Sequence, residues 1–266
     1  MVDASIDVVY RGGLRCDRNY LVEGGTLASQ SNPNPDSEFV DIPVYSLVID
    51  HPDGVVLWDT GHHGDALELW PEEIADAFYP YDCGEHGLET DLEREGWSVS
   101  DIDTVFISHL HPDHAGGIHV FDGTDVPVYV HEEEMKFGYY SVKTPEGVGD
   151  DSYLLDDFDY DLNWRIIHGE RETLFEDVEF IHLPGHTPGM TGTLVHLDSG
   201  SVLFAGDELY LEENYVGGTP IGGALTWDSG DWRESLQRVE ELERRHDAEV
   251  VFGHDPEQFE EIESGW

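Results

Sequence analysis

Residues 104–117 read TVFISHLHPDHAGG, and this stretch decides the fold. Its first half is an apolar run with β-branched residues, which is typical of a buried strand. Its second half places four metal-ligating side chains within six residues: His109, His111, Asp113 and His114. Alternation at a strand end aims the first two histidines together, and the turn at Pro112 presents the other two side chains from another direction. The stretch therefore predicts a site for two metal ions side by side.

Three later segments repeat this design, because each is an apolar strand followed by a ligand-type residue in a glycine-containing turn. The ligand-type residue is His186 in the segment VEFIHLPGHTPG, Asp207 in SVLFAGD, and His254 in EVVFGHD. The turn glycines let the backbone pass close to a site. Together the four segments offer five histidines and two aspartates at strand ends. This set is sufficient for a dinuclear centre with open positions for water and substrate.

The charge of the chain is unusual. Its 266 residues include 59 Asp plus Glu against 12 Lys plus Arg, a formal net charge of -47. Such self-repulsion strains a compact fold at ordinary ionic strength, but in molar salt the screening length falls to about 3 Å. Disorder is the competing explanation, and the eleven Phe and seven Trp argue against it. We therefore expect a halophilic source.

The same charge excludes some partners. A polyanionic surface gains nothing from releasing counterions from phosphates, so we expect no nucleic-acid partner. No apolar run is long enough to span a bilayer, and the first residues, MVDASIDVVYRGG, lack the features of a signal peptide. We expect a cytoplasmic protein without a membrane partner, in which Cys16 and Cys83 are ordinary thiols.

The rest of the chain predicts a layered α/β protein. Apolar runs bounded by turn residues predict strands at residues 6–10, 42–49, 55–59, 104–109, 126–130, 164–168, 178–183, 192–197, 201–206 and 249–254. Helices are expected at residues 88–95, 131–137 and 231–246, the last with a capping box of Asp231 and Glu234. Residues 29–38 predict a loop, and residues 144–161 a surface insertion or lid. We expect packed sheets with helices outside, in one domain over residues 1–266.

The ligand motifs resemble those of the metallo-β-lactamase fold hydrolases: HLHPDHAGG, PGHTPG, AGD and FGHD follow in the expected order over residues 109–254. VVLWDTG resembles the family's N-terminal strand and turn, where Asp59 has a structural or supporting role. The resemblance implies a four-layer αβ/βα sandwich with the metals at the sheet edges. It further implies three groups of ligands: His109, His111 and His186 for one metal; Asp113, His114 and His254 for the other; and Asp207 as the bridge.

Three details narrow the chemistry within this fold. Asp207 stands where antibiotic-hydrolysing members with a thiolate ligand carry Cys, and His111 stands where diiron oxygen reductases carry Glu. The acidic surface argues against the nucleases of this fold. DELYLEENY, with Tyr210 three residues after Asp207, resembles the N-acyl homoserine lactonase branch, as does FGHDPEQF.

The resemblance implies a lactonase with two divalent metal ions. Zinc is the first expectation, and iron, manganese and cobalt are alternatives. A metal-bridging hydroxide would open the ring of N-acyl homoserine lactones or similar lactones. Asp113 would orient the hydroxide and pass its proton to the leaving alkoxide, and Tyr210 would donate a hydrogen bond to the carbonyl oxygen. A packing role is the alternative for Tyr210.

Two other functions stay open. The first is another hydrolase of this fold, such as a thioesterase of the hydroxyacylglutathione hydrolase kind, although Arg and Lys are scarce in the C-terminal third. The second is a metal- or lactone-binding protein without turnover. The sequence leaves the acyl-chain preference, the physiological metal and the oligomeric state open. It also does not decide whether His62 and His63 face the cleft in a supporting role or lie at the surface.

Overall fold

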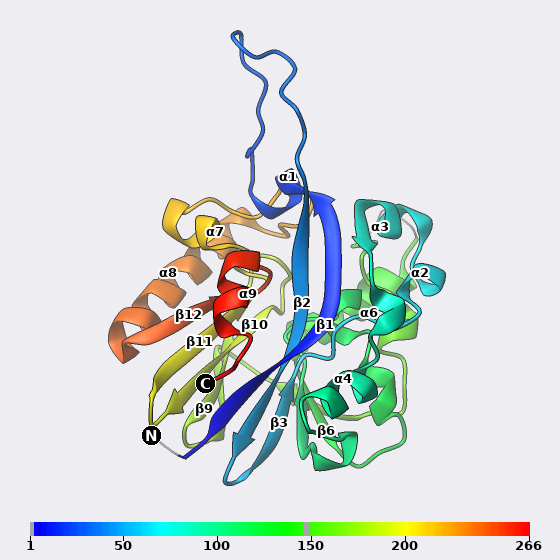
Figure 1. The fold of residues 1–266 in the computed structure, drawn as a ribbon, viewed down its shortest axis with the longest axis vertical. Coiled ribbons are helices and arrows are strands. Elements are labelled where there is room, and N and C mark those ends of the chain that lie inside the picture. Colours follow the sequence, from blue (N-terminus) through cyan, green and yellow to red (C-terminus); the bar gives the residue numbers. More distant parts are fainter. Residues whose placement is uncertain (1–2, 146–148) are drawn as a thin grey trace.

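Two twisted sheets face each other in the computed structural model, which describes residues 3–145 and 149–266 (Figure 1). The larger sheet has seven strands in the spatial order β4 (Phe78–Pro80), β1 (Ser5–Asp17), β2 (Phe39–His51), β3 (Gly54–Trp58), β5 (Thr104–Phe106), β6 (Pro127–His131) and β7 (Asn163–Ile167). The smaller sheet has five strands in the order β12 (Ala248–Phe252), β11 (Gly200–Gly206), β10 (Thr191–Leu197), β9 (Val178–His182) and β8 (Arg171–Phe175).

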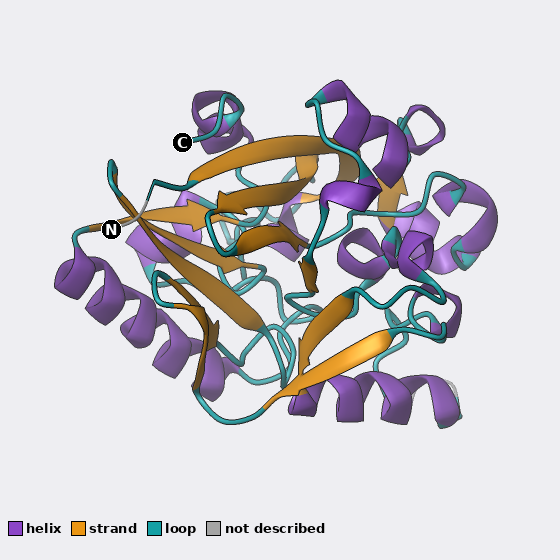
Figure 2. Cartoon of the chain, turned by 90° about the horizontal axis from the view of Figure 1, so that it is seen from below, coloured by secondary structure: helices purple, strands orange, loops and turns teal. Residues whose placement is uncertain are grey.

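Helices flank the strands on both outer sides (Figure 2). The α-helices are α1 (Arg18–Leu21), α2 (Ala66–Leu69), α3 (Glu72–Ala77), α4 (Leu88–Arg94), α5 (Pro112–Ala115), α6 (Glu132–Lys143), α7 (Glu212–Gly217), α8 (Ser229–His246) and α9 (Pro256–Ile262). Short 3₁₀ turns occupy η1 (Cys83–Glu85), η2 (Val99–Asp101), η3 (Ile118–Phe121) and η4 (Leu155–Asp157). The arrangement confirms the predicted four-layer αβ/βα sandwich.

Apolar clusters between and outside the sheets hold the layers together. Between the sheets, the rings of Phe106 and Phe180 stack with centroids 3.9 Å apart. Leu88 and Leu92 of α4 pack on the outer face of the larger sheet. On the smaller sheet, α8 buries its helical stripe of Trp232, Leu236, Val239 and Leu242. Each sheet is therefore buried on both faces in its centre, which explains the nearly continuous apolar strands in the sequence.

The predicted strands and helices are found, but the structure adds elements that were not predicted. Strands β4 and β8 are edge strands; β4 has three residues, and β8 reads RETLF and is largely exposed. A very short or polar edge strand lacks the apolar alternation that identifies a strand. The short helices α1, α2, α3, α5, α7 and α9 were not predicted either, because they are too short to show a helical repeat. The predicted cap of α8 at Asp231 is wrong, because the carboxylate of Asp228 accepts the N–H groups of Gly230 and Asp231. Helix α6 is longer than expected and ends at Lys143.

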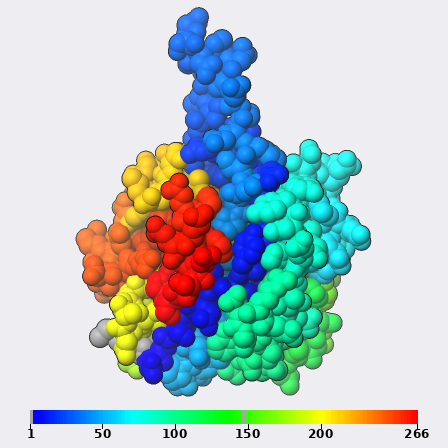
Figure 3. All heavy atoms as spheres, viewed as in Figure 1, coloured from blue at the N-terminus to red at the C-terminus, as the bar shows by residue number. Residues whose placement is uncertain are grey.

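Two segments lie outside the regular layers. Residues 23–38 extend away from the body, in agreement with the loop expected at 29–38 (Figure 3). The predicted insertion at 144–161 includes residues 146–148, which lie outside the described residues. Its later part is mostly exposed or partly exposed at the surface, but Tyr153, Asp157 and Phe158 anchor it in the body. Among the described residues, no helix combines the length and apolar character needed to cross a membrane.

Candidate metal centre

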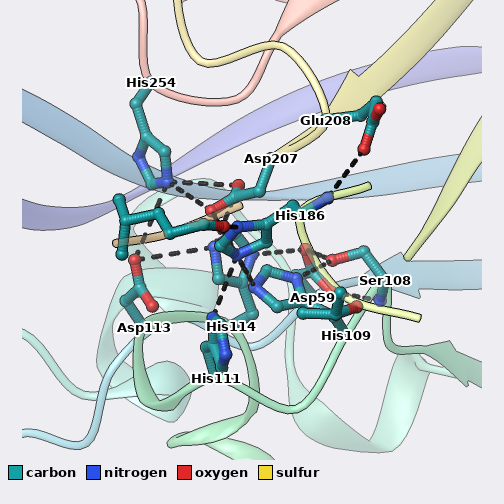
Figure 4. A network of polar contacts seen from close by, with 12 residues as sticks. Asp59, Ser108, His109, His111, Asp113, His114, His186, Asp207, Glu208 and His254 are labelled. Atoms are coloured by element: carbon teal, nitrogen blue, oxygen red, sulfur yellow. Dashed lines mark hydrogen bonds and ion pairs between the residues drawn. The ribbon is translucent and has the colours of Figure 1, made fainter. Parts of the chain in front are cut away.

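All seven predicted ligands meet at one end of the two sheets (Figure 4). Strand β5 leads to His109 and His111, and α5 carries Asp113 and His114. The remaining three follow β9, β11 and β12: His186, Asp207 and His254. They form two clusters, His109–His111–His186 and Asp113–His114–Asp207–His254, and within each cluster the candidate ligand atoms lie within 4.8 Å of one another.

The first cluster consists of converging imidazole nitrogens. Nε2 of His186 lies 3.2 Å from Nε2 of His109 and 3.0 Å from Nδ1 of His111. Nδ1 of His186 donates to the carbonyl oxygen of Leu225 at 2.7 Å, so its Nε2 carries a lone pair. Nitrogens about 2.0–2.1 Å from a tetrahedral metal are about 3.4 Å apart, close to these separations. Facing lone pairs at this distance fit a divalent cation.

The second cluster mixes imidazole and carboxylate. His114 donates from Nδ1 to Oδ2 of Asp59 at 2.8 Å, and His254 donates from Nδ1 to the carbonyl oxygen of Pro43 at 2.8 Å. Their Nε2 atoms are thereby turned inward, and each lies 3.2 Å from Oδ1 of Asp207. Among the described residues, Nε2 of His114 and Oδ1 of Asp207 are buried without a hydrogen-bond partner. These donors also fit a divalent metal.

Asp207 lies between the two clusters. Its Oδ2 is 3.8 Å from Nε2 of His109 and 3.7 Å from Nε2 of His186, whereas Oδ1 faces His114 and His254. Oδ2 also lies 3.3 Å from Nε2 of His254, so this oxygen faces histidines of both clusters, whereas Oδ1 faces those of the second. This geometry suits a residue that bridges two ions.

Burial and charge act differently on the individual histidines; in the first cluster, burial opposes charge on His111 but the Asp150 carboxylate raises its pKa. Burial lowers the pKa of His186 to about 4 and that of His109 well below its ordinary value, so both imidazoles are neutral. Burial opposes charge on His114 as well, but the carboxylates of Asp207, Asp113 and Asp59 raise its pKa well above the ordinary value. The second cluster thus concentrates negative charge, which favours a cation.

Tyr210 lines a chamber of about 40 Å³ together with His111 and Asp113. Its ring centroid lies 4.9 Å from that of His254 and 5.7 Å from that of His186. Burial, followed by the nearby Asp207 carboxylate, raises its pKa well above the ordinary value, so the hydroxyl remains protonated. Tyr210 also packs in an apolar cluster with Leu14. The Tyr210 ring therefore both packs in this apolar cluster and borders the candidate metal centre.

Glu134 supports the site and was not identified from the sequence. Its buried carboxylate accepts the N–H of Leu110 at 2.8 Å and the hydroxyls of Tyr153 at 2.7 Å and Thr187 at 2.6 Å. It thereby ties the turn of His109 and His111 to the turn of His186. Three consecutive glutamates begin α6, and the local sequence does not distinguish Glu134 from its two neighbours.

A second support lies under the turn after β3. Arg11 is fully buried, forms an ion pair with Asp91, and donates to the carbonyl oxygens of Thr60 and His62. This holds the backbone next to Asp59. His62 is buried here and His63 is partly exposed, and neither belongs to the two ligand clusters.

The chain is similar to known proteins over most of its length. Residues 40–254 match the model of the metallo-beta-lactamase superfamily. The chain is 31% identical to the N-acyl homoserine lactonase AiiB of Agrobacterium fabrum over 262 residues, which cover 93% of this chain and 92% of that protein.

Two solved structures share the fold. An N-acyl homoserine lactone hydrolase with the product N-hexanoyl-L-homoserine at its catalytic metal centre superposes with a TM-score of 0.83 at 24% identity, covering 98% of this chain and 97% of that one. The dizinc quorum-quenching lactonase AidC, also in complex with a product, gives a TM-score of 0.70 at 18% identity and covers 96% and 89% of the two chains.

Proposed function

The chain belongs to the metallo-β-lactamase superfamily, and on this premise we propose that it is a hydrolase that opens the lactone ring of N-acyl homoserine lactones or similar lactones. The observation that carries the proposal is the pair of clusters joined by Asp207, with Tyr210 at their edge. A relative with this activity aligns over nearly the whole chain, residues beyond the metal motifs included.

The proposed ligands of one ion are His109, His111 and His186, those of the other are Asp113, His114 and His254, and Asp207 is shared. When bound, two divalent ions lower the pKa of water toward neutrality and polarise a carbonyl group. Nitrogen and oxygen donors suit zinc, which we propose as the metal, with iron, manganese and cobalt as alternatives.

The protein side chains then supply orientation and proton transfer. Tyr210 donates a hydrogen bond from its hydroxyl to the carbonyl oxygen of the lactone, where negative charge develops during attack. Asp113 orients the attacking hydroxide, accepts its proton after the carbonyl carbon is attacked, and passes that proton to the ring oxygen as the C–O bond breaks. Leu14, Trp70 and Phe78 line the same chamber and exclude bulk water from the reacting groups.

We also propose a setting for this activity. The net charge of -47 supports a protein that works in a salt-loaded cytoplasm. The apolar core shared by the two sheets supports a single domain over residues 1–266. Comparable unfolding free energies in dilute buffer and in molar KCl would contradict the halophilic origin.

A substrate panel tests the function. Metal-loaded protein in molar KCl is mixed separately with N-acyl homoserine lactones, with lactones lacking the amide, and with an acylglutathione thioester, and the products are separated by chromatography. We expect ring opening of the lactones. Hydrolysis of the thioester alone would identify a thioesterase, and tight lactone binding without ring opening would identify a binding protein.

A further inference from the structure

A second cavity adjoins the chamber of Tyr210. Its volume is about 540 Å³, against about 40 Å³ for the chamber, and Ile74 of α3 lines both. Asp150 and Tyr153 also line the larger cavity, and both reach His111: Oδ2 of Asp150 lies 3.7 Å from Nε2 of His111, and the rings of Tyr153 and His111 are 4.8 Å apart. The larger cavity therefore lies directly beside the candidate metal centre.

The chamber and the larger cavity differ in volume, so each suits a different part of a substrate. The small chamber borders the reacting groups but lacks room for a long chain. The larger cavity has apolar walls formed by Leu69, Pro71, Ile74, Val142, Leu154 and Leu155. Such walls suit an acyl chain, because removal of its methylene groups from water is favourable.

Five carboxylates also line the larger cavity, and Asp157 is the buried one: Glu73, Asp151 and Asp156 are exposed, and Asp150 lies against His111. Asp157, in η4, lines the cavity and is 4% exposed, and its Oδ2 has no hydrogen-bond partner among the described residues. Burial, followed by the carboxylates of Asp156 and Asp113, raises the pKa of Asp157 to about 8. A buried carboxyl group without a partner is costly, so a ligand that pairs with it gains more than an apolar contact.

We propose that this cavity holds the acyl chain of the substrate and that Asp157 binds a hydroxyl group on that chain. The inference rests on the proposed lactonase function and names its substrate class: N-acyl homoserine lactones with hydroxylated chains. A hydroxyl donates to a carboxylate and also accepts from a protonated carboxyl group, so it pairs with Asp157 in either protonation state. A ketone oxygen only accepts, and an unsubstituted chain leaves Asp157 unpaired.

The test compares N-octanoyl homoserine lactones that differ in one group: a hydroxyl at carbon 3, a hydroxyl at the terminal carbon, an oxo group at carbon 3, or no substituent. For the wild type we expect kcat/KM to be at least about tenfold higher for one hydroxylated lactone than for the unsubstituted one. Asp157→Leu is expected to abolish this ratio while it retains turnover of the unsubstituted lactone. The matched control is Asp161→Asn, which changes an exposed carboxylate of the same segment outside the cavity lining and keeps the ratio.

Binding of the ring-opened products to the wild type gives a second measurement that needs no variant. Calorimetry is expected to show tighter binding of the hydroxylated N-octanoyl homoserine than of the unsubstituted one. Equal kcat/KM values and equal affinities, or a preference that survives Asp157→Leu, would overturn the role of Asp157. Failure of the wild type to open any lactone would instead overturn the proposed function.

Discussion

The carboxylate of Asp59 supports one ligand in each metal cluster. Its Oδ2 accepts from Nδ1 of His114 at 2.8 Å and from the hydroxyl of Ser108 at 2.7 Å. The Ser108 hydroxyl in turn lies 3.1 Å from Nδ1 of His109. Asp59 adopts a φ of 54°, a left-handed backbone conformation that non-glycine residues rarely adopt. A residue outside both clusters therefore sets the orientation of two imidazoles.

Asp59→Asn is expected to weaken metal binding while it preserves the fold. The amide keeps the size of the side chain but removes the charge that orients His114. Loss of such a supporting contact typically costs about 10–100-fold in metal affinity. Competition with a chromophoric chelator measures this, and Asp198→Asn, an exposed change in the turn between β10 and β11, is the control. Equal affinities of Asp59→Asn and the control would contradict the role of Asp59.

Tyr210→Phe is expected to retain two metal ions and to lose about 10²-fold in kcat, as does removal of one hydrogen-bond donor to a developing oxyanion. Metal analysis and lactone turnover on the same sample separate the two effects. Tyr139→Phe is the matched control, because its hydroxyl is bonded to Asp159 at 3.1 Å, away from the site. An unchanged kcat in Tyr210→Phe would leave this residue with its packing role alone.

Glu134→Ala is expected to lower the free energy of unfolding by about 3 kcal/mol or more, because three donors lose their buried acceptor. Urea unfolding at fixed molar KCl measures the change. Glu133→Ala is the control: this partly exposed neighbour pairs with Lys136 at the surface, and its loss is expected to cost less than about 0.5 kcal/mol. Equal stabilities of the two variants would show that Glu134 does not tie the ligand turns together.

The stacked pair of His131 and His182 predicts a dependence of stability on pH. Their ring centroids are 3.9 Å apart, and Nδ1 of His131 accepts from the N–H of Glu133 while Nε2 donates to the carbonyl oxygen of Gly169. This arrangement requires a neutral ring, and burial lowers the pKa of His131 to about 4 and also lowers that of His182.

Between an unfolded pKa of about 6.5 and these lower folded values, the unfolded chain binds protons that the folded protein does not. The free energy of unfolding is therefore expected to fall as the pH decreases from about 6.5 to about 4. His131→Asn keeps a good cap for α6 but does not titrate, so its unfolding free energy is expected to fall less steeply. Denaturant unfolding at several pH values checks this, and parallel curves for the two proteins would contradict it.

The sequence predicted the layers and the approach of the ligands because both follow from local patterns. Apolar strands ending in glycine-containing turns brought His186, Asp207 and His254 to one edge. The role of Glu134 depends on which of three adjacent glutamates faces inward, which is decided by tertiary packing. Asp228 rather than Asp231 caps α8 because of the backbone path before the helix, which spacing alone does not specify. Asp157 is likewise identified by its burial and by the cavity beside it, not by a motif.

A metal titration tests the central claim most directly. Metal-free protein in molar KCl receives increasing equivalents of zinc, and formation of N-hexanoyl homoserine from its lactone is followed by chromatography. We predict that ring opening reaches its full rate at two zinc ions per chain and disappears when a chelator removes them. An intact lactone in the presence of protein with two bound ions, or full ring opening by the metal-free protein, would contradict a dinuclear lactonase.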